Sequence, residues 1–382
     1  MRSPAKRITI QHVEPNSPRS APLDELCRRR TISCGDQGRE KFNQISSQIA
    51  FGADVLRLIA GSGRSGTTWL LDALAEANGL RPVFEPLHTD TSSVGRKFGH
   101  AYLTRNSNCA ELKAMLSAAA EGALNTIWTD YRMKPGRLRI GLKHFRSPAE
   151  LRVLMHKWRE LAHRYAAGRG KKTRCATIVK CIRANLMLDW IHSSIDARIV
   201  LLMRHPGAAV ESRLRFAAHW DPFPLLKKYR NDTALMSGPI NRQAARMNRA
   251  MTRTEALTAI WCIENLVPAA QAASNGYLVT FYEELLERPE TEWPRVAQGL
   301  GLAEVPSATI LHRPSQQAAT RLHRGSAIGE SYVKDYGSWN ARLANDDLAQ
   351  VDAILREFGV DFYTVAEARP NIEAFSLRFL EG

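Results

Sequence analysis

Residues 55–71 read VLRLIAGSGRSGTTWLL, which joins an apolar run to a loop of small residues and then to a helical pattern. The run 55–60 has the length and composition of a buried strand, and residues 67–77 have helical periodicity. Glycines in the loop let successive backbone N–H groups converge on an anion, and the N-terminus of a following helix adds positive potential. This order therefore predicts a phosphate-binding turn.

The side chains of this turn indicate which kind of phosphate it binds. Ser65, Thr67 and Thr68 supply hydroxyl donors, and Arg64 supplies a planar cation. The spacing resembles the nucleoside-triphosphatase loop G-x-x-x-x-G-K-[ST], but Thr67 stands where that loop has lysine. Because lysine neutralises the β- and γ-phosphates there, its replacement favours a donor with fewer charges at that point. A turn that binds nothing is the alternative.

The chain beyond this turn alternates strand-like and helix-like segments. Further strands are expected over residues 81–84, 176–180, 198–203 and 277–281. Helices are expected over residues 110–124, 148–167, 184–192, 206–216, 251–273 and 282–286. This alternation predicts an α/β fold with a central parallel sheet flanked by helices.

Two segments stand apart in composition. Residues 1–50 mix Pro, Ser, Arg and Gln with few spaced apolar positions, which predicts a flexible basic leader before a single domain over 51–382. Residues 220–248 are rich in Pro, Asn, Arg and Gly, so we expect a surface excursion near the site rather than core.

Composition limits the cellular setting and the partners. The formal net charge of +15 favours an anionic ligand, nucleic acid or an acidic membrane surface without choosing among them. The six cysteines include no C-x-x-C pair and no Cys/His cluster at zinc spacing, so we expect no metal site and reduced thiols in the cytoplasm. No signal peptide or apolar run of about 18 residues is evident, so no transmembrane segment is expected.

The turn resembles a motif of a known family. Residues 64–70 are similar to the [K/R]-S-G-[ST]-[ST]-x-[LV] loop of the sulfotransferases that use 3′-phosphoadenosine-5′-phosphosulfate (PAPS). The resemblance implies that Trp69 stacks against the adenine. It also implies that the 5′-phosphate is bound by the remaining residues of the loop, namely Arg64, Ser65, Gly66, Thr67 and Thr68.

A second stretch resembles the same family. Residues 198–214 read RIVLLMRHPGAAVESRL and are similar to its 3′-phosphate signature, a strand ending in R-[DHN]-P before a helix that carries serine. The resemblance implies that Arg204 and Ser212 clamp the 3′-phosphate. The carboxyl end of a parallel strand is also where ligands collect, and arginine suits bidentate phosphate contact. The alternative is that Arg204 belongs to a structural ion pair and that Ser212 is a surface hydroxyl.

Weaker matches extend the resemblance over roughly residues 55–363. VTFYEELL at 279–286 resembles a later strand ending in Y-E-D-L, which implies donor contact by Tyr282. WNARL at 339–343 resembles a W-x-x-x-L segment. The enzymes acting on phenols and steroids carry a late R-K-G loop, whereas this chain has RLHRG at 321–325. From this stretch Arg324 is predicted as a further 3′-phosphate ligand.

The acceptor side is predicted from RPVFEPLH at residues 81–88. Its F-E-P-L core resembles the carbohydrate branch, which sulfates the 6-hydroxyl of N-acetylglucosamine or galactose. This resemblance implies Glu85 as the catalytic base, with His88 as second choice for the base or as a residue that orients the acceptor. Arg64 would stabilise the charge that builds on the leaving phosphate. Glu85 paired with an arginine at a loop is the alternative.

Other polar residues have suitable chemistry without a fixed role. Lys180 and Arg183, in IVKCIR at 178–183, either contact donor or acceptor or are solvated charges at a strand end. Nothing in the spacing of His100 and Tyr102 assigns a function to them.

The sequence thus predicts transfer of the PAPS sulfuryl group to a hydroxyl of a carbohydrate, glycolipid or small metabolite, including anionic glycans, in line and without a metal. Two alternatives stay open. One is a kinase-like phosphotransferase that uses the same turn. The other is a noncatalytic binder of nucleic acid or anionic surfaces, which charge alone favours, because the chain lacks an interleaved aromatic and basic patch and no specific nucleic-acid partner is expected.

Overall fold

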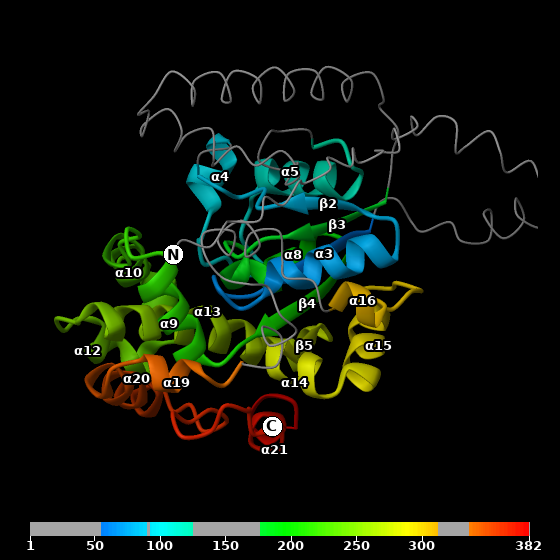
Figure 1. Cartoon of the computed structure of the whole chain (residues 1–382). Helices are drawn as coiled ribbons and strands as arrows, with labels where there is room; N and C mark the ends of the chain where they lie inside the picture. Colours follow the sequence, from blue (N-terminus) through cyan, green and yellow to red (C-terminus); the bar gives the residue numbers. More distant parts are fainter. Residues whose placement is uncertain (1–54, 90–91, 125–175, 312–335, 382) are drawn as a thin grey trace, which may run out of the picture. The chain divides into compact units, whose positions relative to one another are not determined.

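A computed structural model describes residues 55–89, 92–124, 176–311 and 336–381 (Figure 1). The expected leader at 1–50, the helix expected over 148–167 and Arg324 lie outside the described residues. The domain boundary at residue 51 therefore stays a prediction.

The described chain forms a five-stranded, fully parallel sheet with the order β2-β3-β1-β4-β5 (Figure 1). The strands are β1 (Leu56–Ala60), β2 (Arg81–Phe84), β3 (Thr177–Lys180), β4 (Ala197–Met203) and β5 (Leu278–Phe281). Each begins within one residue of its expected start and ends at its expected end. The predicted α/β fold with a central parallel sheet is confirmed.

Strand β1 is the centre of the sheet. Leu58 aligns with Val179 of β3 on one side and with Ile199 of β4 on the other. All five residues of β1 are buried, as expected for a parallel strand that is covered on both faces. The order of the strands changes direction at β1, so the loop after β1 lies at the topological switch point, where open α/β sheets bind ligands.

Two apolar clusters cover the two faces of the sheet. Ile59 and its neighbours on one face pack against α3 (Thr67–Ala77) and α15 (Pro289–Gly299). Leu58 and its neighbours on the other face belong to a cluster with α5 (Ala110–Ala120), α8 (Leu188–Ser194), α9 (Pro206–Phe216) and α13 (Arg253–Asn275). The alternation of side chains along each strand therefore sends one set of residues to each helical layer.

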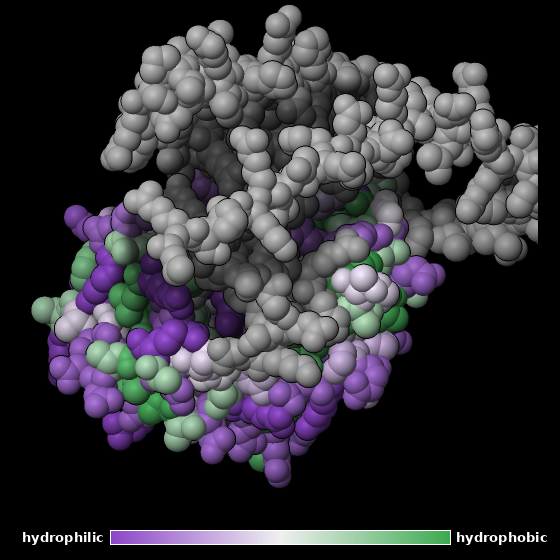
Figure 2. All heavy atoms as spheres, viewed as in Figure 1, coloured by the Kyte–Doolittle hydropathy of each residue, from purple (hydrophilic) through white to green (hydrophobic). Residues whose placement is uncertain are grey.

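The remaining helices complete the described fold. They are α4 (Ser93–Phe98), η2 (Asn185–Met187), α10 (Phe223–Arg230), α11 (Thr233–Ser237), η3 (Asn241–Gln243), α12 (Ala244–Met247), α14 (Tyr282–Glu287), α16 (Ala308–Leu311), α19 (Trp339–Arg342), α20 (Asn345–Glu357) and α21 (Ile372–Phe379). On the face seen in Figure 2, hydrophilic residues predominate over α12, α19 and α20, whereas apolar residues gather around α16.

The segment 220–248 is mostly exposed, as expected, but it is helical and contributes a few residues to the core. It contains α10, α11, η3 and α12, and Leu226, Tyr229 and Leu235 are buried in the larger core cluster. The turn-forming residues lie between short amphipathic helices instead of throughout the segment. Their apolar residues, spaced three or four apart, face the core.

The central position of β1 makes a stability prediction. Replacing Leu58, which is fully buried, with alanine leaves a cavity beneath the helical layer on that face and should lower the free energy of unfolding by about 2–5 kcal/mol. Leu377→Ala is the control, because Leu377 is 59% exposed and should change the free energy by less than about 0.5 kcal/mol. Urea denaturation followed by circular dichroism measures both, and equal effects would contradict the assignment of β1 to the core.

Candidate functional site

The loop between β1 and α3 packs too tightly for side chains at two of its glycines. Gly61 has φ 150°, and a Cβ there would lie 2.4 Å from the carbonyl oxygen of Leu202. Gly66 has φ 90°, and a Cβ there would lie 2.6 Å from the ring of Tyr282. Gly66 is also the N-cap of α3 and has no side chain to accept from the first helical N–H groups. These donors therefore suit an anion at the helix N-terminus.

The predicted hydroxyls surround the start of α3. Thr67 and Thr68 are its first two residues and are buried. Ser65 is fully buried, and its Oγ lies 2.8 Å from Oγ of Ser62. This hydrogen bond fixes the loop from within.

The two predicted phosphate motifs are in direct contact. Nε of Arg64 donates to Oγ of Ser212 over 2.8 Å, across 148 positions of sequence. Nη1 of Arg204 donates to the carbonyl oxygen of Arg64 over 3.3 Å. Arg64 itself has φ 79°, an uncommon conformation for a residue other than glycine. The carboxyl ends of the adjacent strands β1 and β4 thus bring these three side chains into one cluster.

An aromatic surface adjoins this cluster. The guanidinium carbon of Arg204 lies 4.5 Å from the centroid of the Tyr282 ring. The Trp69 ring meets Tyr282 edge to face at 5.4 Å and Trp293 at 5.1 Å. Trp69 is thereby held between the loop and α15.

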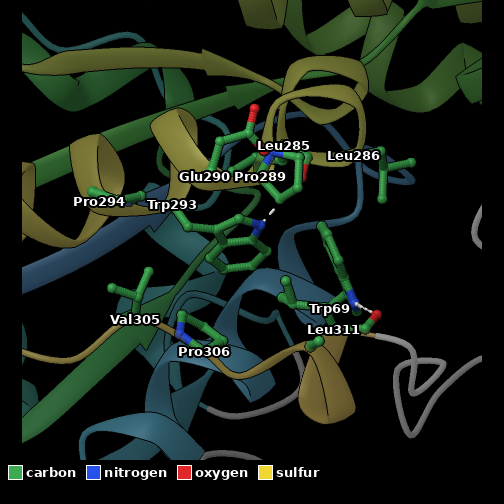
Figure 3. A pocket seen from close by; sticks show the side chains of 11 residues that line it. Trp69, Leu285, Leu286, Pro289, Glu290, Trp293, Pro294, Val305, Pro306 and Leu311 are labelled. Carbon is green, nitrogen blue, oxygen red and sulfur yellow. Dashed lines mark hydrogen bonds between the residues drawn. The ribbon is translucent and has the colours of Figure 1, made fainter.

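Trp69 also lines an apolar pocket of about 410 Å³ (Figure 3). The other lining residues are Leu285, Leu286, Pro289, Glu290, Trp293, Pro294, Val305, Pro306, Ala308 and Leu311. The indole Nε1 of Trp69 donates to the carbonyl oxygen of Leu311 over 3.3 Å, which fixes the ring at the side of the pocket. A cluster of phosphate-type donors therefore lies beside an apolar aromatic surface.

Arg204 is held by residues that sequence reasoning missed. Its carbonyl oxygen accepts from the indole of Trp261 over 3.0 Å. The next residue, His205, donates its backbone N–H to Glu283, and Oε2 of Glu283 accepts from the hydroxyl of Tyr363. No local motif identifies these partners, because they come from α13, α14 and the C-terminal part of the chain.

The ring of His205 is buried and neutral, and it lies between the start of α9 and the C-terminal segment. Its Nε2 lies 2.9 Å from the carbonyl oxygen of Thr364, and its Nδ1 accepts from the N–H of Gly207 over 3.0 Å. Burial, and then the charge of Arg204, lower the pKa of His205 to about 3. The ring stacks on Trp339 at 4.2 Å, and a Cβ at Gly207 would collide with that same indole. The start of α9 is thus fixed against the C-terminal segment.

Glu85 lies at the end of β2 in a saturated environment. It is buried and has φ 48°. Oε1 accepts from Nζ of Lys180 at 2.5 Å and from the backbone N–H of Ile182 at 3.1 Å. Oε2 accepts from Nη1 of Arg183 at 2.7 Å. Lys180 and Arg183 are therefore partners of Glu85 in this arrangement instead of solvated charges.

The charge state of Glu85 follows from these partners. Burial raises its pKa, but the positive charges of Lys180 and Arg183 together with the hydrogen bonds outweigh burial and lower the pKa to about 2. A carboxylate with so low a pKa is a poor proton acceptor near neutral pH. The geometry matches the alternative in which Glu85 pairs with basic residues and argues against Glu85 as the base. The side chain of His88 is half-buried, and its backbone N–H donates to the carbonyl oxygen of Glu85.

A second network lies behind the loop and has no sequence signature. The N–H of Gly61 donates to Oδ1 of Asn185 over 3.0 Å, and Nδ2 of Asn185 donates to the carbonyl oxygen of Glu264 over 2.9 Å. Nη2 of Arg213 donates to the carbonyl oxygen of Gly63 over 3.3 Å. The loop is thereby connected to the long helix α13.

The described residues contain neither a cluster suited to a metal ion nor a helix suited to spanning a membrane. No group of three or more His, Cys, Asp and Glu residues there has an arrangement suited to a metal ion. No helix within the described ranges combines the length and apolar character needed to cross a membrane.

No protein-family model and no curated protein matches the chain. Similar solved structures include a sulfotransferase domain from the curacin biosynthetic pathway, 14% identical, with 79% of this chain and 96% of that chain covered and a TM-score of 0.40. Retinol dehydratase in complex with androsterone and the inactive cofactor PAP is 15% identical, with 81% and 82% covered and a TM-score of 0.33. The complex of retinol dehydratase with retinol and PAP is 14% identical, with 81% and 83% covered and a TM-score of 0.33. Similarity at this level assigns no activity to the chain.

The lowered pKa of Glu85 predicts a dependence of stability on pH. Its folded pKa lies below the ordinary value of 4.5, so its stabilisation is complete above about pH 5 and is lost as pH falls toward 2, by about 3 kcal/mol in total. In Glu85→Gln this loss should disappear. At pH 7 the variant should be less stable by about 3–5 kcal/mol, because Lys180 and Arg183 lose a buried partner.

Urea denaturation at several pH values between 3 and 7 measures both effects. Glu111→Gln is the matched control, because Glu111 is 53% exposed and pairs with an exposed lysine, Lys97. A Glu85→Gln variant with the same pH dependence as the parent chain would contradict the assignment.

Proposed function

We propose that this chain transfers the sulfuryl group of PAPS to a hydroxyl group of an acceptor. The observation that carries the proposal is the contact of Arg64 with Ser212 and of Arg204 with the backbone of Arg64. Resemblance assigns the first motif to the 5′-phosphate and the second to the 3′-phosphate of a single nucleotide. Motifs that serve one adenosine bisphosphate must adjoin each other, and these two do.

The described residues suit the parts of that donor. The 5′-phosphosulfate fits the N-terminus of α3, where Thr67 and Thr68 add hydroxyls to the backbone donors. The guanidinium of Arg204 can donate hydrogen bonds to a 3′-phosphate, and so can the hydroxyl of Ser212, whose oxygen accepts from Arg64. Trp69 offers an aromatic surface to the adenine beside these donors.

The same arrangement suits in-line transfer. The acceptor oxygen bonds to sulfur while the bond between sulfur and the 5′-phosphate oxygen breaks, and negative charge builds on that phosphate. Arg64 and the N-terminus of α3 lie where they would stabilise this charge. The step needs no covalent enzyme intermediate and no metal.

The acceptor class is proposed on weaker grounds. The F-E-P-L resemblance favours a carbohydrate, and a glycolipid or small metabolite carries the same hydroxyl chemistry. The net charge of +15 suits an anionic donor and acceptor. We propose a cytoplasmic setting from the cysteine pattern alone.

Isothermal titration calorimetry with PAP, the desulfated donor, tests the proposed site. Arg204→Ala should weaken PAP binding about 10- to 100-fold, because it removes a charge-assisted phosphate contact, and Ser212→Ala should weaken it by about tenfold or less. Arg356→Ala is the control, because Arg356 is 74% exposed on α20 and should leave the affinity unchanged.

Other outcomes would replace the proposal. No heat of binding at high micromolar PAP would overturn it. Tight binding of magnesium and ATP in place of PAP would favour the kinase-like phosphotransferase. Affinity for nucleic acid that survives Arg204→Ala, without nucleotide binding by the parent chain, would favour the noncatalytic binder.

A further inference from the structure

His100 follows α4 and is held in an unusual backbone conformation. Its φ is 61°, in the left-handed region that residues other than glycine rarely adopt. Its N–H donates to the carbonyl oxygen of Arg183 over 2.9 Å, which joins it to the loop after β3. Strained residues of this kind persist where the surroundings hold them, and they cluster at functional sites.

The ring of His100 is oriented by a buried carboxylate. Nδ1 lies 3.1 Å from Oε1 of Glu264, a residue of α13 that is 1% exposed. The same oxygen accepts from the hydroxyl of Tyr229 over 2.9 Å. The Tyr229 proton is thus used on Glu264, and a carboxylate only accepts hydrogen bonds. The hydroxyl oxygen of Tyr229 also lies 3.3 Å from Nδ1, but its proton is directed to Glu264 over the shorter distance. Both neighbours of Nδ1 thus offer lone pairs, which favours the tautomer of a neutral His100 with the ring proton on Nδ1.

The other ring nitrogen is consequently an acceptor. Nε2 of His100 bears the lone pair in this tautomer. In the part of the chain that the structure describes, Nε2 makes no hydrogen bond, and the side chain is 17% exposed. An oriented imidazole with one free lone pair that solvent can reach is the form that a general base requires.

The carboxylate that orients His100 is tied to the loop that would hold the donor. The backbone of Glu264 is connected to Gly61 through Asn185, as described above. Nη2 of Arg213 lies 3.9 Å from Oε2 of Glu264 and also donates to the carbonyl oxygen of Gly63. The position of His100 is thus fixed relative to the loop by two independent connections.

We propose that His100 is the catalytic base of the sulfuryl transfer, with Glu264 as the residue that positions it; this rests on the proposed function. Nε2 takes the proton of the acceptor hydroxyl while the acceptor oxygen bonds to sulfur. The bond between sulfur and the 5′-phosphate oxygen breaks, and its electron pair leaves with PAP. Glu264 stabilises the imidazolium, which returns the proton to water after the products leave.

His100 fits this role better than Glu85. Both oxygens of Glu85 are occupied by Lys180, Arg183 and the N–H of Ile182. A base must present a lone pair to the incoming hydroxyl. His100 presents one, and the oxygens of Glu85 are engaged with fixed cations.

The variant His100→Asn tests the proposal. Asparagine tolerates the left-handed conformation and its amide can donate to Glu264, but it cannot take up a proton. With labelled PAPS as donor, and water or N-acetylglucosamine as acceptor, turnover should fall about 10²- to 10⁴-fold while PAP affinity in calorimetry stays unchanged. His192→Asn, at an exposed histidine of α8, is the matched control. Parent-like turnover in His100→Asn would overturn the proposal.

Nuclear magnetic resonance of chain labelled at histidine gives a readout that needs no acceptor. At about pH 8.5, above the ordinary range of histidine pKa values in proteins, nitrogen chemical shifts should show the proton of His100 on Nδ1, with the signal assigned by its loss in His100→Asn. Glu264→Gln should shift the population toward the other tautomer, an effect that a purely structural role would not produce. A proton on Nε2 in the parent chain would overturn the assignment of the base. Absence of PAP binding in the parent would instead overturn the proposed function and leave the tautomer result intact.

Discussion

The close approach of the 61–66 loop to its neighbours is the constraint on which the site depends. Gly61 lies against the backbone of β4, and Gly66 lies against the ring of Tyr282. A side chain at either position would push the loop away from the sheet edge. The backbone donors at the start of α3 and the arginines that follow β1 and β4, Arg64 and Arg204, would then no longer adjoin. Sheet order and loop geometry therefore act together, because the switch point brings the strand ends together and the glycines keep them close.

Where a local signal marked an element, its bounds could be predicted. Helices α3 and α9 match their expected ranges, since the glycine loop precedes the first and Pro206 begins the second. Segment 220–248 is mostly exposed, as its composition indicated, but its short helices were not predicted. Its Pro, Asn and Gly residues separate short helices, and a residue such as Tyr229 is buried only because α13 lies beside it. The composition of a segment gives no information about the helices that pack against it.

In the candidate site, too, the residues that belong to local motifs could be predicted and the contacts between distant segments could not. The cluster of Arg64, Arg204 and Ser212 was expected because each member belongs to a contiguous motif. The partners of Glu85 and the dyad of His100 with Glu264 depend on contacts between distant segments. No spacing in one sequence shows that residues 100 and 264 meet. The sequence position of Glu85 after a strand likewise does not show whether basic side chains pair with its carboxylate.

The packing of His205 against Trp339 has a consequence for synthesis of the chain on the ribosome. The glycine loop and α3 come early in the sequence, but the residues that support Arg204 and His205 include Trp339, Tyr363 and Thr364, which come late. A nascent chain that lacks these residues cannot form the contacts that hold the start of α9. Assembly of the candidate site thus waits until residues 339–364 have been translated.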